Sequence, residues 1–242
     1  MKNISAGDIA IHALKKLFRK TVWRSVHLYR PFGLWRRRGD IMDLDCDFWI
    51  DGAPRCSNSF AVTLFRLSNP DAKVVSHWHV PCFPIYMARH NKPGFLLIRK
   101  PVDSAISWAI YKMKPLEFAF DFYIDYYTLL LPHLSLFPIF SFDEVTADFP
   151  FVIRKVNTRY DTQFSPPENS EKTTRSALNS IKSTWNGANA DEYRIPCPSM
   201  TREPIKQTLH EKIESTEYLK LKLKKAQNLY QTILASTNCL TY

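Results

Sequence analysis

The chain has 242 residues, of which 45% are hydrophobic and 14% aromatic, and its formal net charge is +10. This length and composition suffice for one domain with a substantial core and exclude a mainly disordered chain. Ten Lys or Arg residues but only one acid, Asp8, lie within residues 1–38, so nearly all of the net charge belongs to this segment. A protein that binds nucleic acid over its whole surface is therefore not expected.

The cysteines and the apolar segments bear on the compartment. The five cysteines are Cys46, Cys56, Cys82, Cys197 and Cys239. They are scattered and form no Cys-x-x-Cys pair, which argues against a disulfide framework or a cysteine zinc site and favours a reducing compartment. Charged residues interrupt the first apolar positions, so no signal peptide is recognised. The most apolar stretch, residues 118–140, contains two Asp and is predicted to be a buried helix and strand. We expect a cytoplasmic protein, either free or peripheral to a membrane.

Residues 1–40 form a basic N-terminal segment that is distinct from the rest of the chain. Apolar residues recur in it at steps of three and four: Ile11, Leu14, Phe18, Val22, Val26 and Tyr29. This spacing predicts one amphipathic helix that ends near Pro31 and Gly33. Such a helix either packs on the domain with its cations in solvent, or contacts an anionic partner through residues 8–38. The anionic partners considered are a membrane surface and an acidic polymer.

Short apolar runs and helical patterns alternate through the main domain, residues 45–242. The predicted strands cover residues 48–50, 73–77, 95–99 and 137–142, and the predicted helices cover 58–67, 84–89, 101–112, 151–160 and 202–234. This alternation predicts an α/β fold with a single doubly wound, mostly parallel sheet flanked by helices.

The first strand-to-helix junction with residues suited to ligand binding is Gly52-Ala-Pro-Arg-Cys-Ser-Asn-Ser-Phe60. Backbone N–H groups at the start of such a helix, together with an arginine, favour an anion. The chain has only six glycines and contains neither Gly-x-Gly-x-x-Gly nor a Gly-Lys pair, so it has no Rossmann or Walker A motif. A plain turn with capping serines is the other interpretation of the junction.

This junction resembles the 5'-phosphosulfate loop of sulfotransferases that use 3'-phosphoadenylyl sulfate (PAPS). The resemblance implies a P-loop-like sulfotransferase fold and donor contacts from Pro54, Arg55, Cys56, Ser57, Asn58, Ser59 and Phe60. Pro54 and Arg55 match the family pattern, as do the hydroxyl of Ser59 and the aromatic ring of Phe60. The three residues between them depart from it, and Ser57 replaces a glycine.

A second junction resembles the 3'-phosphate motif of the same family. Arg99 ends a predicted strand and Ser107 follows eight residues later in the next helix. The resemblance implies that both residues hold the 3'-phosphate, Arg99 as a charged clamp and Ser107 through its hydroxyl. The acidic pair after the strand at residues 140–144 is also similar to the family. The family's Arg-Lys-Gly segment is absent, and Arg194 or Arg202 is expected to take its place at the nucleotide.

Two histidines, His77 and His79, follow the second predicted strand in the sequence Ser-His-Trp-His-Val-Pro. The family carries a hydroxyl residue and a histidine there, and histidine suits a general base near neutral pH. On an extended strand both rings would share one face, and we favour His77 as the base. Half of a metal site is the other interpretation of His-x-His, but no third ligand has a suggestive spacing, so no metal is expected.

Three functions follow from these observations. The first is transfer of a sulfuryl group from PAPS to an acceptor hydroxyl or amine, on a carbohydrate, another glycan or a lipid, with adenosine 3',5'-bisphosphate as the product. Arg55 would stabilise charge on the departing phosphate, as in phosphoryl transfer. The second is a nucleotide-dependent kinase with a degenerate phosphate loop, which would use Asp143-Glu144 to hold Mg²⁺. The third is a non-catalytic module that binds anions or a membrane surface.

Overall fold

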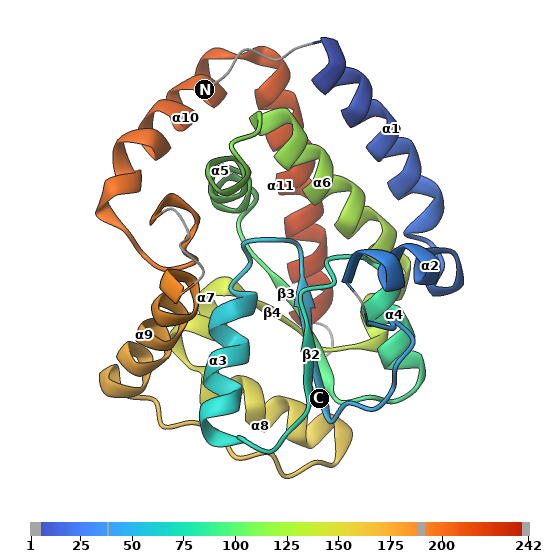
Figure 1. Ribbon diagram of the computed structural model, residues 1–242, viewed down its shortest axis with the longest axis vertical. Coiled ribbons are helices and arrows are strands. Elements are labelled where there is room, and N and C mark those ends of the chain that lie inside the picture. The colour runs from blue at the N-terminus through green and yellow to red at the C-terminus, as the bar shows by residue number, and fades with distance from the viewer. Residues whose placement is uncertain (1–5, 38, 188–191, 239–242) are drawn as a thin grey trace.

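The computed structural model describes residues 6–37, 39–187 and 192–238. At its centre is a sheet of four parallel strands in the order β2-β1-β3-β4 (Figure 1). The strands are β1 (Phe48–Gly52), β2 (Val74–Ser76), β3 (Gly94–Ile98) and β4 (Ile139–Ser141). Lys2, Arg38 and Cys239, which entered the sequence predictions, lie outside the described residues.

Helices cover both faces of this sheet. Successive side chains of a strand point to opposite faces of the sheet, so the contacts of Phe48 and Trp49 show which helix covers each face at β1. Phe48 stacks on Phe65 of α3 (Asn58–Ser68), whereas Trp49 meets Phe83 of α4 (Cys82–Arg89) edge to face. All residues of β1 and β3 are buried, which explains why both strands are nearly continuous apolar runs.

The other helices complete the layers around the sheet. They are α5 (Pro101–Lys112), α6 (Leu116–Leu130), α7 (Phe142–Ala147), α8 (Phe149–Tyr160), α9 (Glu171–Gly187), α10 (Glu203–Ser215) and α11 (Glu217–Asn238). Short 3-10 turns lie at Leu131–Leu136, Glu192–Arg194 and Met200–Arg202. The α/β fold with one parallel sheet flanked by helices is confirmed. None of the described helices has the length and apolar character needed to cross a membrane.

Each of the two long terminal helices predicted from periodicity is in fact a pair. The N-terminal segment forms α1 (Ala6–Val22) and α2 (Val26–Arg37), and Pro31 lies inside α2 instead of ending a helix. The C-terminal segment breaks at Thr216, whose backbone is extended, between α10 and α11. Buried core residues lie beside both breaks: Trp23 and Val26 at the first, and Ile213 and Leu219 at the second.

The packing of α1 also differs from the sequence prediction. Its polar residues His12, Lys16 and Arg19 face α6, where they pair with Asp121 and Asp125. Leu14 and Leu17 are instead exposed. Periodicity identified an amphipathic helix correctly but could not show which face would meet the domain, because the acidic residues on α6 decide it.

Candidate functional site

The predicted phosphate loop joins the end of β1 to the start of α3 in an unusual backbone conformation. Arg55 has φ 72° and Ser57 has φ 79°, and both values lie in the left-handed region that glycine tolerates best. The turn at Ser57 leads directly into α3, and the side chain of Ser57, the N-cap residue, makes no capping hydrogen bond to the first N–H groups of that helix. These N–H groups therefore remain able to bind an anion at the helix N-terminus.

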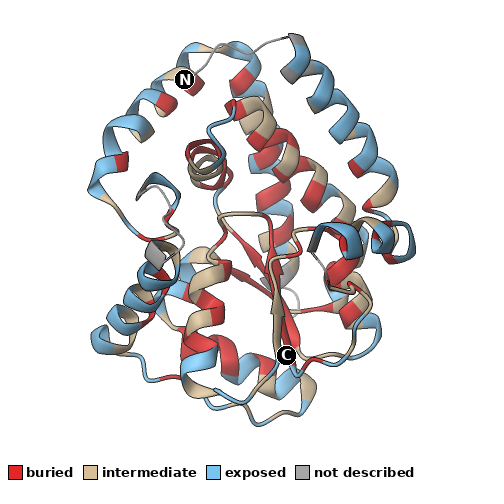
Figure 2. Ribbon diagram, in the orientation of Figure 1, coloured by how far each residue is buried: buried red, intermediate tan, exposed pale blue. Residues whose placement is uncertain are grey.

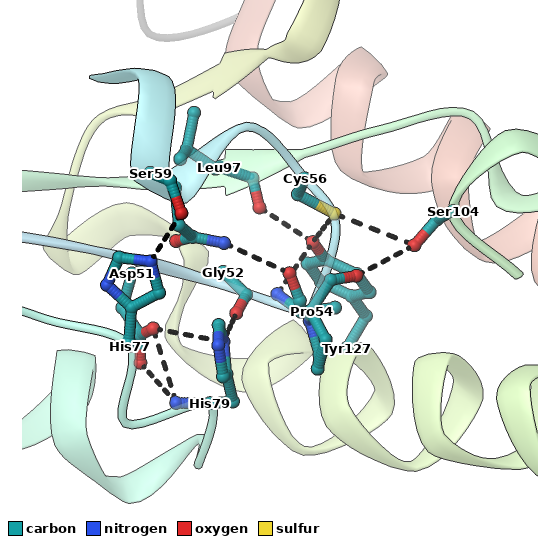
Figure 3. A network of polar contacts seen from close by, with 12 residues as sticks. Asp51, Gly52, Pro54, Cys56, Ser59, His77, His79, Leu97, Ser104 and Tyr127 are labelled. Atoms are coloured by element: carbon teal, nitrogen blue, oxygen red, sulfur yellow. Dashed lines mark hydrogen bonds and ion pairs between the residues drawn. The ribbon is translucent and has the colours of Figure 1, made fainter. Parts of the chain in front are cut away.

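Buried hydrogen bonds fix the loop from below (Figure 3). The hydroxyl of Tyr127 donates to the Leu97 carbonyl at 2.6 Å and accepts from the Ala53 N–H at 3.3 Å. Ser104 donates to the Pro54 carbonyl at 3.2 Å. Because the partners lie on β3, α5 and α6, the strained loop is held by the rest of the fold.

The side chain of Cys56, a predicted donor-site residue, points into the protein and helps to hold the loop, so any contact of Cys56 with a ligand would come from its backbone. Its side chain is fully buried, with Sγ 3.5 Å from the Tyr127 hydroxyl and 3.8 Å from Ser104 Oγ. Burial raises the pKa of the thiol, so it stays protonated. Asn58 is also buried and donates its amide to the Ala53 carbonyl, although it borders the cleft described below.

Arginines from separate parts of the chain converge above the loop. Arg55 Nε donates to Ser107 Oγ at 2.9 Å, and Arg99 Nη1 donates to the Arg55 carbonyl at 3.1 Å. Burial, together with the positive charges of Arg202 and Arg99, lowers the pKa of Arg55 to about 10. Arg55 still carries its charge at neutral pH. Like charges gathered in this way are stabilised by an anion between them.

Arg99 lies at the carboxyl end of β3, as predicted. Its guanidinium carbon is 4.1 Å from the centre of the Phe142 ring, and its carbonyl accepts from the Tyr123 hydroxyl at 2.9 Å. Its Nε is buried and has no hydrogen-bond partner among the described residues. A buried N–H group without an acceptor lowers the stability of the fold. Arg99 is therefore suited to bind an anionic ligand, which would supply the acceptor.

The structure brings His77 and His79 together, with ring centroids 5.6 Å apart (Figure 3). They do not lie on an extended strand, because β2 ends at Ser76 and both histidines have positive φ. His77 Nε2 is 3.1 Å from Ser59 Oγ. The prediction that the two histidines lie close together is correct. The cause is a pair of tight backbone turns, and not the alternation of side chains along a strand.

His79 is held in one tautomer by the end of β1. The ring Nδ1 of His79 lies 2.7 Å from the Gly52 carbonyl oxygen. The backbone N–H of His79 donates to the buried carboxylate of Asp51 at 3.0 Å. A carbonyl oxygen only accepts, so Nδ1 carries the proton and the lone pair of the neutral ring is on Nε2. The Asp51 carboxylate lies 3.5 Å from the same Nδ1.

These groups border a cleft of about 530 Å³ at the carboxyl ends of the strands. Its lining includes Pro54, Arg55, Ser57, Asn58, Ser59, Phe60, His77, His79, Arg99 and Ser107. The opposite wall, which the sequence did not predict, comes from α9, α10 and the turn before α10. That wall contributes Thr174, Leu178, Trp185, Pro196, Cys197, Pro198, Arg202, Lys206 and His210. The apolar periodicity of α9 was the available signal, but it cannot show which strand ends a helix covers.

Of the two arginines considered for the closing segment, the structure places Arg202 and not Arg194 at the cleft. Arg202 is buried, and its Nη1 donates to the Ile195 carbonyl at 3.1 Å. Arg194 is exposed and is not among the described residues that line the cleft. Arg202 directly precedes α10, so the start of that helix fixes its position.

The acidic pair required by the kinase interpretation has other partners. Asp143 forms an exposed ion pair with Lys100 at 3.0 Å, and Glu144 forms a capping box with Ser141 at the start of α7. Neither residue is among the described lining residues. The acid that does border the cleft is Asp103, beside the cations Arg55, Arg99, Arg202 and Lys206. Charge in the cleft therefore favours an anion.

Comparisons with known proteins identify no relative of this chain. No family model, no curated protein and no solved structure matches the chain.

Proposed function

We propose that the protein is a sulfotransferase that moves a sulfuryl group from PAPS to an acceptor hydroxyl or amine, with no metal ion. The observation that carries this proposal is the hydrogen bond from Arg55 to Ser107 at 2.9 Å. It joins the two stretches that resemble the 5'-phosphosulfate loop and the 3'-phosphate motif. A ligand with two separate anionic groups would engage both stretches at once, and PAPS is such a ligand.

The residues of the cleft fit a nucleotide with charges at both ends. The N–H groups at the start of α3 and the guanidinium of Arg55 suit the phosphosulfate. Arg99, whose Nε has no hydrogen-bond acceptor among the described residues, and Ser107 are suited to bind the 3'-phosphate. Phe142 and Trp185 also line the cleft and offer aromatic surface to the adenine.

The proposed transfer breaks the bond between sulfur and the bridging phosphate oxygen and forms a bond between sulfur and the acceptor atom. The electron pair of the broken bond goes to the phosphate, where Arg55 stabilises the added negative charge. We assign the acceptor proton to Nε2 of His79, because the Gly52 carbonyl fixes the required tautomer. His77, which contacts Ser59, is assigned to orienting that hydroxyl. Carbohydrates, other glycans and lipids remain the acceptor classes considered.

Calorimetric titration with adenosine 3',5'-bisphosphate, in a metal-free buffer with chelator, tests the donor site. The intact protein should bind it more tightly than adenosine 5'-monophosphate, which lacks the 3'-phosphate. Arg99→Ala should remove most of that difference, while Arg154→Ala, which changes an exposed arginine on α8, should preserve it. A folded protein that binds neither nucleotide would overturn the proposal.

Two further results would favour the other functions. Binding of ATP that requires Mg²⁺ would support the kinase, and equal binding of bisphosphate and inorganic sulfate would support the anion-binding module. The assignment of the base is tested by His77→Asn and His79→Asn, because asparagine tolerates positive φ. With PAPS and a panel of sugar and phenol acceptors, His79→Asn should lower turnover about a hundredfold or more and spare bisphosphate binding.

A further inference from the structure

Helix α1 is attached to the domain through a polar face. His12 Nε2 lies 2.9 Å from Asp121 of α6, Lys16 Nζ lies 3.2 Å from the same carboxylate, and Arg19 pairs with Asp125 at 2.9 Å. The ring of His12 also stacks on Phe118. Because the Arg19 and Asp125 side chains are nearly buried, these contacts set the rotation of α1 about its own axis.

Much of α1 is exposed to solvent (Figure 2), and its exposed face carries apolar side chains. Each residue turns an α-helix by about 100°, so Leu14 lies nearly opposite Lys16 and Arg19. Leu14 is 67% exposed and Leu17 is 64% exposed, and Ile11 is exposed beside them. Isolated exposed leucines are ordinary, but three on one face of one helix form a stripe that water solvates poorly.

The stripe continues onto α2 through a chain of aromatic contacts. The ring of Phe18 on α1 lies 5.1 Å from that of Phe32, which in turn lies 5.9 Å from that of Trp35. Trp35 is the most exposed member, at 78%, and Leu28 is exposed one heptad before it. We call Ile11, Leu14, Leu17, Leu28 and Trp35 the α1–α2 apolar surface.

Basic side chains border this surface. Lys15 lies on one flank of the α1 stripe and Lys20 lies on the other, as follows from the turn of about 100° per residue. Arg24 lies in the turn that follows α1. All three are exposed, as is Arg36 beside Trp35. An apolar stripe with tryptophan, bordered by lysine and arginine, matches the boundary between acyl chains and anionic headgroups.

We propose that the α1–α2 apolar surface binds the face of an anionic lipid bilayer, with α1 lying in the plane of the membrane. Charge complementarity selects this occupant. A second copy of the chain would bring two basic borders together, which like-charge repulsion disfavours. An acidic polymer would pair with the cations but would leave the leucines and Trp35 exposed. This proposal does not rest on the proposed sulfuryl transfer, because the surface and the cleft have no lining residue in common.

Sedimentation of the full chain with lipid vesicles tests the proposal. Vesicles that contain phosphatidylglycerol should bind the protein at least tenfold more tightly than vesicles of phosphatidylcholine alone, and added salt should weaken this binding. The double variant Leu14→Gln/Trp35→Gln should bind the anionic vesicles about tenfold or more weakly, because it removes the two most exposed apolar side chains of the surface.

Leu221→Gln is the matched control, because Leu221 is 66% exposed on α11, outside this surface. It should bind as the unmodified protein does, and circular dichroism should show all variants equally folded. The proposal fails if the intact protein does not bind the anionic vesicles, or if the double variant binds them equally well. It also fails if light scattering shows a dimer that the double variant abolishes, since a second copy would then cover the surface.

Discussion

Arg55 and Ser107 lie 52 residues apart in the chain, and the Arg55 Nε donates a hydrogen bond to the Ser107 hydroxyl at 2.9 Å. Arg55 follows β1 and Ser107 lies on α5, which follows β3, the strand that pairs directly with β1. Parallel pairing therefore brings two candidate anion-binding stretches to the same edge of the sheet. The bond also limits where the Arg55 guanidinium can point, so Ser107 positions a charge in addition to offering its own hydroxyl.

We predict that Ser107→Ala weakens binding of adenosine 3',5'-bisphosphate about tenfold. The change removes a donor to the ligand and leaves the Arg55 guanidinium free to rotate, and a hydrogen bond to a charged group contributes about 1.5–3 kcal/mol. Thermal stability should change little, because Ser107 is only partly buried. Calorimetric titration measures the affinity. Ser215→Ala, an exposed serine at the end of α10, is the control, and equal affinities for both variants would contradict the prediction.

We predict that Ser57→Gly stabilises the protein. Ser57 has φ 79° and ψ 12°, a left-handed conformation that costs a residue with a Cβ atom about 1–2 kcal/mol. Glycine should recover about 1 kcal/mol of this, and should raise the Tm by about 2–4 °C for a chain of this size. Differential scanning calorimetry measures the change. Ser57→Ala keeps the Cβ atom and should show no gain, so an equal rise in both variants would mean that the hydroxyl, not the backbone, is responsible.

The strands around the loop could be predicted from the sequence because each leaves a local signal. Buried strands such as β1 and β3 are nearly continuous apolar runs. Arg99 directly follows β3, and Arg55 lies in the loop just after β1. The wall that α9 and α10 add to the cleft leaves no such signal, because it depends on how distant helices pack. The sequence left Arg194 and Arg202 as alternatives for the same reason, since both arginines flank the same proline-rich turn.

The orientation of α1 could not be predicted from its apolar periodicity, because electrostatic contacts with α6 determine it. Amphipathic periodicity predicts that the apolar side packs inward, and burial of Leu14 would ordinarily decide the matter. Here Asp121 and Asp125 on α6 are nearly buried and need cations, and α1 supplies them. Leaving such carboxylates unpaired would cost more than exposing leucines, so the polar side of α1 packs inward.

Two neighbouring buried tyrosines should respond differently to the loss of their hydroxyls. Tyr127→Phe removes the bond to the Leu97 carbonyl and the acceptor for the Ala53 N–H, so it should cost about 1–3 kcal/mol. Tyr126 is equally buried, but its hydroxyl has no hydrogen-bond partner among the described residues. Tyr126→Phe should therefore be neutral or stabilising. Urea unfolding measures both, and equal losses would contradict the hydrogen-bond network under the phosphate loop.

The carboxylate of Asp121 should make stability depend on pH in the acid range. Burial alone would raise its pKa, but hydrogen bonds from Lys222 and His12 outweigh burial and lower the pKa to about 2. In the unfolded chain the pKa is about 3.9. Because the folded value is the lower one, the contribution is complete above about pH 4 and is lost as the pH falls towards 2.

We therefore predict that Asp121→Asn lowers the free energy of unfolding by about 2–3 kcal/mol at pH 7 and by about half as much at pH 3. The loss arises because Lys16 of α1 and Lys222 of α11 give up their shared partner. Urea unfolding of both proteins at the two pH values measures it. Asp71→Asn, in the exposed turn before β2, should show little loss at either pH. A loss for Asp121→Asn that is the same at pH 7 and pH 3 would mean that the ionised carboxylate does not hold α1 and α11 on α6.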